Sequence, residues 1–218
     1  MAFGTYVFDA YGTLFDVHAA VRRCSAAIGP EGQRVSEIWR AKQLEYSWVR
    51  ALMGRYRDFW TLTEEALDYA IAVAAPDKAA LKPALLDAYR RIDAYPDVRR
   101  VLERLKRRGA RLLILSNGSA EMLAAATASA GIKDLLDAVI SVDSIRSYKT
   151  DPRVYELVVE RLRLDPPSIS FQSSNRWDVA GAVAYGFRAI WVNRTAQPNE
   201  YGDLPPLAAV ESLDDLDA

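Results

Sequence analysis

The stretch YVFDAYGTLFD, residues 6–16, brings a carboxylate to the end of a short apolar run. Gly12 and Thr13 interrupt the run directly after this carboxylate, Asp9, and so place it at a turn. Two residues beyond Asp9 stands Tyr11 and not a second acid. A carboxylate can act as a nucleophile that forms an ester, and such covalent catalysis divides one difficult displacement into two easier steps. The motif therefore points to a reaction that uses one acid here and does not need a pair.

Three more groups of polar residues follow apolar runs that are typical of strands. SNGS begins with Ser116 and Asn117, a lysine stands at position 149, and QSSNRWD ends on Asp178. Because ligands of open parallel sheets bind beyond the carboxyl ends of the strands, we expect these groups to meet Asp9 at one site. Each group alone is typical of a turn or of a solvated surface. The four together, in this order, favour a functional site.

The elements that must position these groups alternate between strands and helices. Short apolar runs predict strands at 6–8, 112–115, 138–142, 169–171 and 189–192. Helical patterns with proline or serine at their start, or glycine at their end, lie between them at 96–109, 119–131 and 151–164. This alternation predicts an α/β fold with a Rossmann-like parallel sheet core covered on both faces.

Residues 17–95 interrupt the alternation, because their patterns are helical and show no convincing strand. We expect an inserted helical-bundle cap domain over 17–95, with the core domain formed by 1–16 and 96–218. Within the cap, YSWVRALMGRYRDFW holds five aromatic residues in fifteen. We expect most of them in the core of the bundle, with a cleft or a dimer contact as alternatives. The tail after position 193 is expected to be loop-like, because it is rich in proline.

Composition excludes several function classes. The 218 residues are 50% hydrophobic and 26% charged, as in a soluble globular protein. A net charge of −1 gives no attraction to nucleic acid or anionic membranes, and no apolar run approaches the ~20 residues of a membrane span. The start of the sequence does not read as a secretory signal, so we expect a cytoplasmic protein.

The single cysteine and the single histidine limit the chemistry further. Cys24 allows no internal disulfide, and no Cys/His pattern suggests zinc. His18 alone provides neither a Ser-His-Asp nor a Cys-His arrangement. We expect His18 to be structural and Cys24 to be a small buried residue.

In their residues and in their order along the chain, the motifs resemble those of the haloacid dehalogenase superfamily. The resemblance extends over essentially the whole chain. The resemblance identifies DAYGT as the first motif with Asp9 as nucleophile, Ser116-Asn117 as the second, Lys149 as the third, and the segment ending in Asp178 as the fourth. It implies a helical cap between the first two motifs. DAYGT, SNG, SSNRWD and the cap segment WRAKQLEYSWVRALMGRYRDFW resemble, more specifically, the (S)-2-haloacid dehalogenases.

Two positions depart from the pattern of the superfamily, most of whose members are magnesium-dependent phosphatases with a D-x-D first motif. Tyr11 replaces the second aspartate, and Ser174 stands where a further acid of the fourth motif would be. Because Mg²⁺ is usually held by carboxylates, we expect no metal site and no cofactor. Tyr11 also leaves no acid to protonate an alkoxide leaving group, whereas a halide leaves unprotonated. The departures fit displacement at a carbon–halogen bond.

For such an enzyme the resemblance implies a first step in which Asp9 attacks C2 of an L-2-haloalkanoic acid, giving an aspartyl ester and free halide. Arg40 and the Asn117 amide are expected to stabilise the halide, and Phe59 is expected to form the apolar side of the halide site. The substrate carboxylate is expected to be held by Ser116 and by backbone amides of the turn, at Ala10 and Tyr11.

In the second step, water attacks the ester carbonyl carbon and releases a D-2-hydroxy acid. Lys149 is expected to stabilise the Asp9 carboxylate and to help bind the substrate anion. Asp178 is expected either to act as general base or to position Lys149, and Tyr155 to hydrogen-bond near them. Trp177 either covers the substrate alkyl group or belongs to the core. The residues expected to orient or activate the water are Thr13, Ser173, Asn175 and Asp178.

Three other readings stay open at this point. A related hydrolase could open the strained ring of azetidine-2-carboxylate with the same nucleophile. A phosphatase would require Mg²⁺ despite Tyr11 and Ser174. A non-catalytic binding protein on this scaffold would be expected to lose Asp9, Lys149 or Asp178, and all three are present. The dehalogenase reading implies a small 2-haloacid as partner and, by resemblance, a homodimer.

Overall fold

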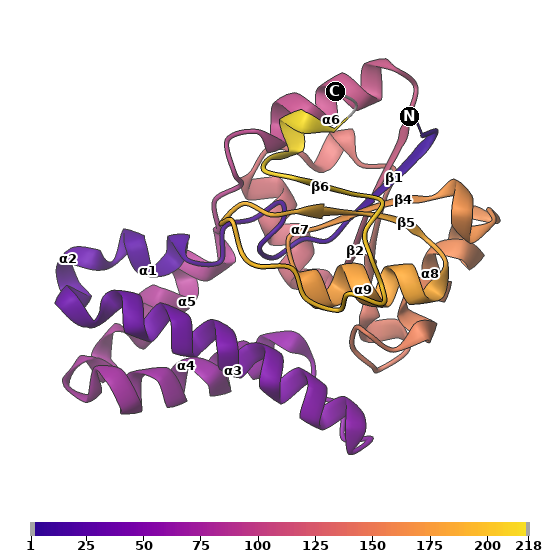
Figure 1. Cartoon of the computed structure of the whole chain (residues 1–218). Helices are drawn as coiled ribbons and strands as arrows, with labels where there is room; N and C mark the ends of the chain where they lie inside the picture. Colours follow the sequence, from indigo (N-terminus) through magenta and orange to yellow (C-terminus); the bar gives the residue numbers. More distant parts are fainter. Residues whose placement is uncertain (1–2, 217–218) are drawn as a thin grey trace.

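A parallel sheet forms the centre of the larger lobe. The computed structural model describes residues 3–216 (Figure 1), and within them six strands lie in the order β3-β2-β1-β4-β5-β6. Their bounds are β1 Thr5–Phe8, β2 Arg111–Ser116, β3 Ala138–Ser141, β4 Ser170–Ser173, β5 Arg188–Val192 and β6 Ala208–Val210. Every residue of β1 and β4 is buried, as in a sheet with both faces covered. The chain leaves β1 in one direction and β4 in the other, which places a crevice at the carboxyl ends of these two strands.

Helices α6 (Val98–Arg107), α7 (Ala120–Ser129), α8 (Pro152–Leu162) and α9 (Arg176–Tyr185) connect the strands. Local sequence explains where two of them begin. Ser119 caps α7 by accepting the Met122 N–H at 3.3 Å, and Asp151 caps α8 by accepting the Arg153 N–H at 3.0 Å. Helix α6 packs on β2, α7 on β3, and α9 on β4 and β5. The predicted α/β core is confirmed.

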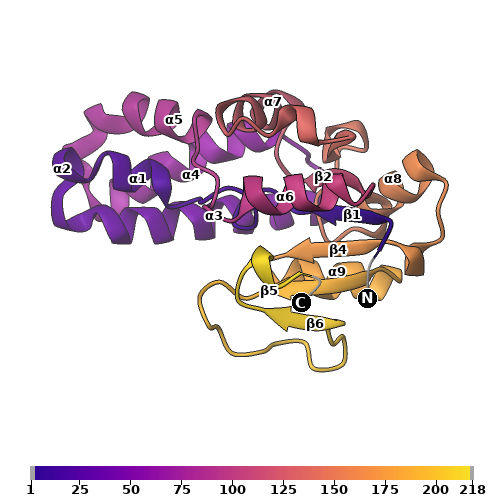
Figure 2. The same ribbon diagram turned by 90° about the horizontal axis from the view of Figure 1, so that it is seen from above.

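A second, helical lobe lies between β1 and β2 in the sequence and beside the sheet in space (Figures 1 and 2). It contains α1 (Ala19–Arg23), α2 (Ser25–Ile28), α3 (Gly32–Leu52), α4 (Phe59–Ala74) and α5 (Lys82–Arg90). The predicted helical insertion is present, and its exact limits at 17 and 95 stay a prediction. In the part of the chain that the structure describes, no helix is long and apolar enough to span a membrane.

The pair α3–α4 is the centre of the helical lobe. Trp39 donates its indole N–H to the Thr63 carbonyl at 2.8 Å, and Gln43 donates to the Thr63 hydroxyl at 2.9 Å. The Asp58 carboxylate caps α4 by accepting the Thr61 N–H at 3.0 Å. These contacts fix α3 against α4 and so fix the side chains that α3 turns toward the sheet.

The prediction that most aromatic residues of 46–60 lie in the bundle core holds only in part. Phe59 is buried, whereas Tyr46, Tyr56 and Trp60 are half-buried and Trp48 is 37% exposed. The segment ends α3 and turns into α4, where the lobe faces the sheet domain. Tyr56 accordingly hydrogen-bonds Asp143 of the core at 2.5 Å.

The C-terminal tail also corrects the sequence analysis, because it contains β6 and a 3₁₀ turn over Leu213–Asp215. Strand β6 has three residues and pairs with β5 along the edge of the sheet. Backbone hydrogen bonds form this strand, and its side chains are largely exposed. No apolar alternation therefore marks it in the sequence.

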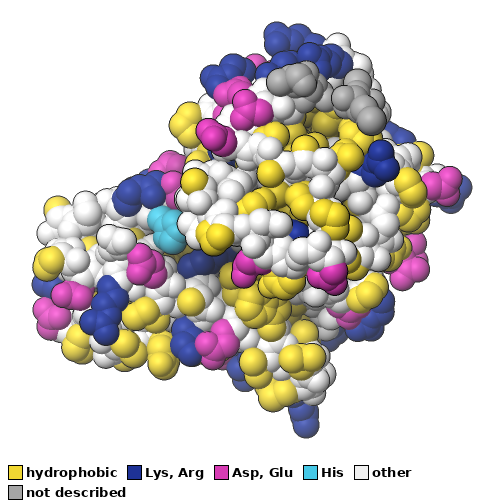
Figure 3. Space-filling view, viewed as in Figure 1, with side chains coloured by type: hydrophobic (Ala, Val, Ile, Leu, Met, Phe, Trp, Pro, Cys, Tyr) yellow, Lys and Arg dark blue, Asp and Glu magenta, His cyan; other side chains and the backbone are white. Residues whose placement is uncertain are grey.

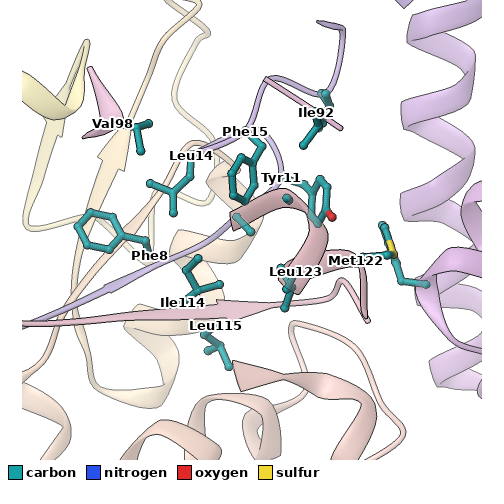
Figure 4. Close-up of a cluster of buried hydrophobic side chains, with 14 of the residues drawn as sticks. Phe8, Tyr11, Leu14, Phe15, Ile92, Val98, Ile114, Leu115, Met122 and Leu123 are labelled. Atoms are coloured by element: carbon teal, nitrogen blue, oxygen red, sulfur yellow. The ribbon is translucent and has the colours of Figure 1, made fainter. Parts of the chain in front are cut away.

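Two chain segments cross between the lobes and hydrogen-bond to each other. Asp16 N–H donates to the Asp93 carbonyl at 2.8 Å, and Tyr95 N–H to the Leu14 carbonyl at 2.9 Å. Buried side chains from both segments and from β2 and α7 pack around this crossing, with Tyr11 among them (Figure 4). The turn that follows β1 is thereby held firmly at the junction of the two lobes.

Candidate active site

Asp9 directly follows β1 and is 5% exposed. Its backbone N–H donates to the Gln172 carbonyl of β4 at 2.9 Å, so it sits in the crevice between these strands. The chain then turns sharply: the N–H groups of Thr13, Leu14 and Phe15 all donate to the Ala10 carbonyl. The Asp9 carboxylate is consequently held at the end of the sheet, facing the helical lobe.

Three neutral donors hold one oxygen of the Asp9 carboxylate. Oδ2 accepts hydrogen bonds from Thr13 Oγ1 at 3.0 Å, Ser173 Oγ at 3.3 Å and Asn175 Nδ2 at 2.8 Å. Thr13 is fixed in turn, because its hydroxyl oxygen accepts the Ser174 N–H at 2.8 Å. The other oxygen, Oδ1, accepts from Lys149 Nζ at 2.9 Å.

Lys149 joins two carboxylates inside the protein. Its Nζ is 2.9 Å from Asp9 Oδ1 and 2.8 Å from Asp178 Oδ2, and its side chain is fully buried. Burial disfavours the ammonium, but the two carboxylates outweigh burial and raise the pKa of Lys149. Burying these charges costs solvation free energy, which only paired and hydrogen-bonded partners offset. The cation therefore depends on both acids.

Asp178, in the first turn of α9, is completely buried. Burial raises the pKa of Asp178 to about 6, although Lys149 acts in the opposite direction. Tyr155 of α8 donates its hydroxyl to Asp178 Oδ1 at 2.8 Å. This approach requires a glycine in α9: a Cβ on Gly181 would lie 2.4 Å from the Tyr155 oxygen.

The turn after β2 brings Ser116 and Asn117 to the same edge. Ser116 Oγ accepts the Gly118 N–H at 3.0 Å, and Asn117 Oδ1 accepts the Lys149 N–H at 2.9 Å. Since its carbonyl oxygen is engaged in this way, the Asn117 amide has its NH₂ group left for another acceptor. Both residues are buried and line the space in front of Asp9.

Arg40 reaches this space from α3 of the helical lobe. Its Nη2 donates to the Tyr11 carbonyl at 3.1 Å and to Asn175 Oδ1 at 3.3 Å. Asn175 thus links the guanidinium to Asp9, to which its own NH₂ donates. A guanidinium carries several donors, so Arg40 can hold an anion while keeping these contacts.

Most residues expected from the sequence surround one small cavity of about 10 Å³. The expected residues that line it are Asp9, Tyr11, Arg40, Phe59, Ser116, Asn117, Asn175 and Trp177. The expected residues Thr13, Lys149 and Ser173 contact Asp9 from behind, and Asp178 and Tyr155 follow Lys149 one layer further in. Ala10 is buried and does not line the cavity.

Sequence reasoning missed two residues that α3 turns toward the sheet. Leu44 lines the cavity in front of Asp9, and Trp48 contacts Trp177 edge to face with ring centroids 5.4 Å apart. Residues 40, 44 and 48 follow one another at the helical spacing of four. That spacing places them on one face of α3 and was the signal that could have found them.

Tyr11 fills the junction between the lobes with an aromatic ring. It stacks on Tyr89 of α5 with centroids 5.7 Å apart, and lies 5.9 Å from Phe15 and 6.4 Å from Phe59. The fit is close, because a Cβ on Gly118 would lie 2.7 Å from Tyr11 Cε2. Burial raises the pKa of the Tyr11 hydroxyl well above its ordinary value, so it does not replace a carboxylate.

The site does not fit the magnesium ion of the superfamily's phosphatases. Residues 3–216 contain no group of three or more His, Cys, Asp or Glu side chains that could hold a metal. The Lys149 ammonium contacts the two acids of the site, Asp9 and Asp178. Both carboxylates are thus paired with a cation that the protein itself supplies, and the acids missing at Tyr11 and Ser174 leave no further carboxylate for a metal ion.

His18 and Cys24 lie outside this site. The His18 ring is 2.7 Å from Ser36 Oγ through Nδ1, at the start of the helical lobe, and burial lowers its pKa. Cys24 is half-buried, which corrects the expectation that it is buried, because it lies at the bend between the short helices α1 and α2.

Comparisons with known proteins agree with this geometry. A model of the haloacid dehalogenase-like hydrolase family matches residues 3–186. The (S)-2-haloacid dehalogenase 1 of Pseudomonas sp. (strain CBS-3) is 47% identical to this chain, over 96% of this chain and 93% of its own. The crystal structure of a dehalogenase has a TM-score of 0.96 at 44% identity, covering 99% of this chain and 96% of that one.

A further solved structure is that of L-2-haloacid dehalogenase from Xanthobacter autotrophicus with chloropropionic acid covalently bound. It has a TM-score of 0.87 at 39% identity and covers 99% of this chain and 97% of that one. The identities and the coverage extend through both lobes of the molecule. The chain therefore belongs to the haloacid dehalogenase-like hydrolases and, within them, to the family of the (S)-2-haloacid dehalogenases.

Proposed function

We propose that this hydrolase of carbon–halide bonds converts L-2-haloalkanoic acids to D-2-hydroxy acids through an ester on Asp9, without a metal ion. The observation that carries the proposal is the environment of Asp9, a buried carboxylate held by Lys149 and three neutral donors. Arg40 faces it from the other lobe. Covalently bound chloropropionic acid in the relative from Xanthobacter autotrophicus supports an intermediate attached to the protein.

In the first step Asp9 attacks C2 of the substrate, an O–C bond forms, and the carbon–halogen bond breaks with its electron pair on the halide. Arg40 and the Asn117 NH₂ stabilise this halide, and Phe59 provides an apolar wall beside it. Ser116 and backbone amides of the turn at Tyr11 hold the substrate carboxylate, which fixes the face of C2 that meets Asp9. The Lys149 ammonium contacts the Asp9 carboxylate and orients it before the attack.

We assign attack to Asp9 Oδ1, since among the described residues this oxygen accepts from Lys149 alone, and the ester carbonyl to Oδ2. Water then adds to the carbonyl carbon, and Oδ2 gains negative charge. Thr13, Ser173 and Asn175 already donate to this oxygen and stabilise that charge without rearrangement. The ester bond breaks, Asp9 is regenerated, and one halide and one proton have been released for each water consumed.

Of the two roles expected for Asp178, positioning of Lys149 has the stronger support. One of its oxygens contacts Lys149 and the other contacts Tyr155. The carboxylate is fully buried and does not line the cavity in front of Asp9. A general base must come within hydrogen-bond reach of the attacking water, directly or through one further water.

The experiment that tests the proposal measures halide release from L- and D-2-chloropropanoate, each with and without EDTA. We expect release from the L-enantiomer, equal in both conditions, and none from Asp9→Asn protein whose circular dichroism is unchanged. A single turnover in H₂¹⁸O should leave ¹⁸O in Asp9 and ¹⁶O in the product, since the hydroxyl oxygen comes from the carboxylate.

Two outcomes would contradict the proposal. Release that EDTA abolishes would mean that a metal takes part. No release from either enantiomer would exclude dehalogenation of this substrate and favour ring opening of azetidine-2-carboxylate, which the same preparation can test.

We further propose that the protein is a cytoplasmic homodimer with no nucleic-acid or membrane partner. Family membership supports the dimer, as do the exposed apolar side chains of Val49 and Met53 at the end of α3 and of Tyr69 and Val73 on α4. The near-zero net charge supports the absence of polyanionic partners. Light scattering measures the oligomeric state directly.

A further inference from the structure

Two hollows of very different size meet at Trp177. The inner one, in front of Asp9, measures about 10 Å³, and the outer one measures about 770 Å³. Trp177 is the residue that lines both. We name the larger hollow the outer groove; it lies between the C-terminal end of α3 and helices α8 and α9. Hydrophobic side chains gather on the surface where α3 approaches the core (Figure 3).

The inner cavity is too small for any 2-haloacid. A cavity needs about 10–15 Å³ to hold a single water molecule, and a haloacid has several heavy atoms. Binding therefore requires one wall to move. Most walls are fixed, because Asp9, Tyr11, Phe59 and their buried neighbours have packed side chains behind them. Trp177 has the outer groove behind it.

The tryptophans on this groove differ from the others in how they are anchored. Trp39, Trp60 and Trp191 each donate the indole N–H to a protein oxygen, at 2.8, 2.8 and 3.2 Å. Within residues 3–216, the indole N–H groups of Trp48 and Trp177 have no such partner, and the two rings contact each other edge to face. They can turn without breaking a hydrogen bond.

The lining of the outer groove determines which part of a substrate it accepts. It is largely apolar, with Leu52, Ala180, Ala184 and Leu204 among its walls. Of the described residues that line it, Lys149 carries the cationic side chain, and its ammonium is turned inward to the two buried acids. Asp151 also lines the groove, and its carboxylate is paired with Arg153 at 2.5 Å. The described lining of the groove thus offers no free cation to the carboxylate end of a haloacid and suits a hydrocarbon chain.

Resting on the function proposed above, we propose that the Trp48–Trp177 pair sets the limit on substrate chain length. The halide and the carboxylate lie against Arg40 and Ser116, and the alkyl group on C2 points to Trp177. Short chains end at this indole. Longer chains displace the Trp48–Trp177 pair and continue into the outer groove. The contact between the two lobes at these rings therefore decides how readily long-chain substrates are accepted.

The test compares kcat/KM for L-2-bromopropanoate and L-2-bromooctanoate, which differ in chain length and share one leaving group. In Trp48→Ala and in Trp177→Ala we expect the octanoate-to-propanoate ratio to rise by about tenfold or more, as for pocket space gained by several methylene groups. Trp60→Ala is the matched control, a tryptophan of the same lobe that lies on neither hollow. Its ratio should equal that of the wild type.

Trp48→Ala should disturb folding less than Trp177→Ala, since the Trp48 side chain is 37% exposed. If Trp177→Ala does not fold, Trp177→Phe takes its place, because phenylalanine retains an aromatic ring. Inhibition by unhalogenated octanoate gives a second measurement: its Ki should fall in Trp48→Ala, while that of propanoate stays constant. Equal gains for both bromoacids would overturn the proposal and make the groove an access route alone. An unchanged ratio in variants that remain active would also overturn it. Inactivity of the wild-type protein toward every haloacid would instead refute the proposed function.

Discussion

Tyr155 donates its hydroxyl to the Asp178 oxygen that Lys149 does not contact, at 2.8 Å. Both oxygens of this buried carboxylate are therefore engaged by protein groups. Asp178 is the innermost member of a chain of contacts that runs outward through Lys149 to Asp9, the proposed nucleophile. A change in the charge of Asp178 should reach the nucleophile through the position of the lysine.

The first prediction concerns pH. Burial raises the pKa of Asp178 to about 6, so the carboxyl becomes protonated, and loses its hold on Lys149, as pH falls through 6. We expect kcat/KM to decline below this pH. Stability follows the opposite sense, because the folded protein binds this proton more tightly than the unfolded chain, whose aspartate has a pKa near ~3.9. The contribution of Asp178 to stability is complete below the unfolded pKa of ~3.9 and is lost as pH rises through 6. A rate profile from pH 4.5 to 8 measures the first effect.

The second prediction separates the two roles of Asp178. If it positions Lys149, Asp178→Asn slows formation of the ester as well as its hydrolysis, and no ester accumulates. If it were the general base, formation would continue and hydrolysis would stop. Mass spectrometry of the variant after mixing with L-2-chloropropanoate detects the added mass of the ester, and its accumulation would contradict the positioning role.

The third prediction uses the hydroxyl of Tyr155. Its hydrogen bond favours the ionised form of Asp178 and so lowers the pKa of that carboxyl. In Tyr155→Phe the acidic limb of the rate profile should move to higher pH, and unfolding free energy should drop by about 1–2 kcal/mol through the lost buried hydrogen bond. Tyr185→Phe, a half-buried neighbour in ring contact with Tyr155, is the control and should leave the limb in place.

The fourth prediction removes the shared cation. Lys149→Met leaves Asp9 and Asp178 buried with no positive charge between them, and should cost about 3–5 kcal/mol of unfolding free energy at pH 8. The loss should be smaller at pH 5, since protonation of Asp178 removes one of the two charges. Urea denaturation at both pH values gives the difference, and Lys133→Met, at an exposed lysine, serves as reference. An equal loss at both pH values would argue against this account.

The fifth prediction concerns the position of the missing acid. Tyr11→Asp restores the D-x-D pattern but places a carboxylate among Phe15, Phe59 and Tyr89. We expect a loss of about 3 kcal/mol or more of stability and no Mg²⁺-dependent hydrolysis of p-nitrophenyl phosphate, because the further acid of the fourth motif is still missing at Ser174. Tyr11→Phe keeps the ring and should remain stable. Turnover that requires Mg²⁺ would show that residue 11 alone excludes the metal.

The sequence predicted the fold class, and the residues it proposed for the site largely lie together in the structure, because strand ends of a parallel sheet meet at one edge wherever the intervening chain lies. Asp9, Ser116, Lys149 and Asp178 could be read in this way. Leu44 and Trp48 could not be read so directly, since which face of α3 meets the sheet depends on how the two lobes pack. Strand β6 escaped prediction because backbone pairing at an exposed edge leaves no side-chain pattern.

The helical lobe is inserted soon after Asp9, the proposed nucleophile, so the two lobes contribute different residues to the site. Arg40, Leu44 and Phe59 come from the inserted helices, whereas the groups that hold the Asp9 carboxylate come from the sheet domain. Substitutions in the insertion can therefore alter which leaving group or side chain is accepted while the hydrolytic machinery stays intact. In evolution, or in a chimaera that exchanges the segment between relatives, the part of the selectivity that comes from the inserted helices would change separately from the groups that hold Asp9.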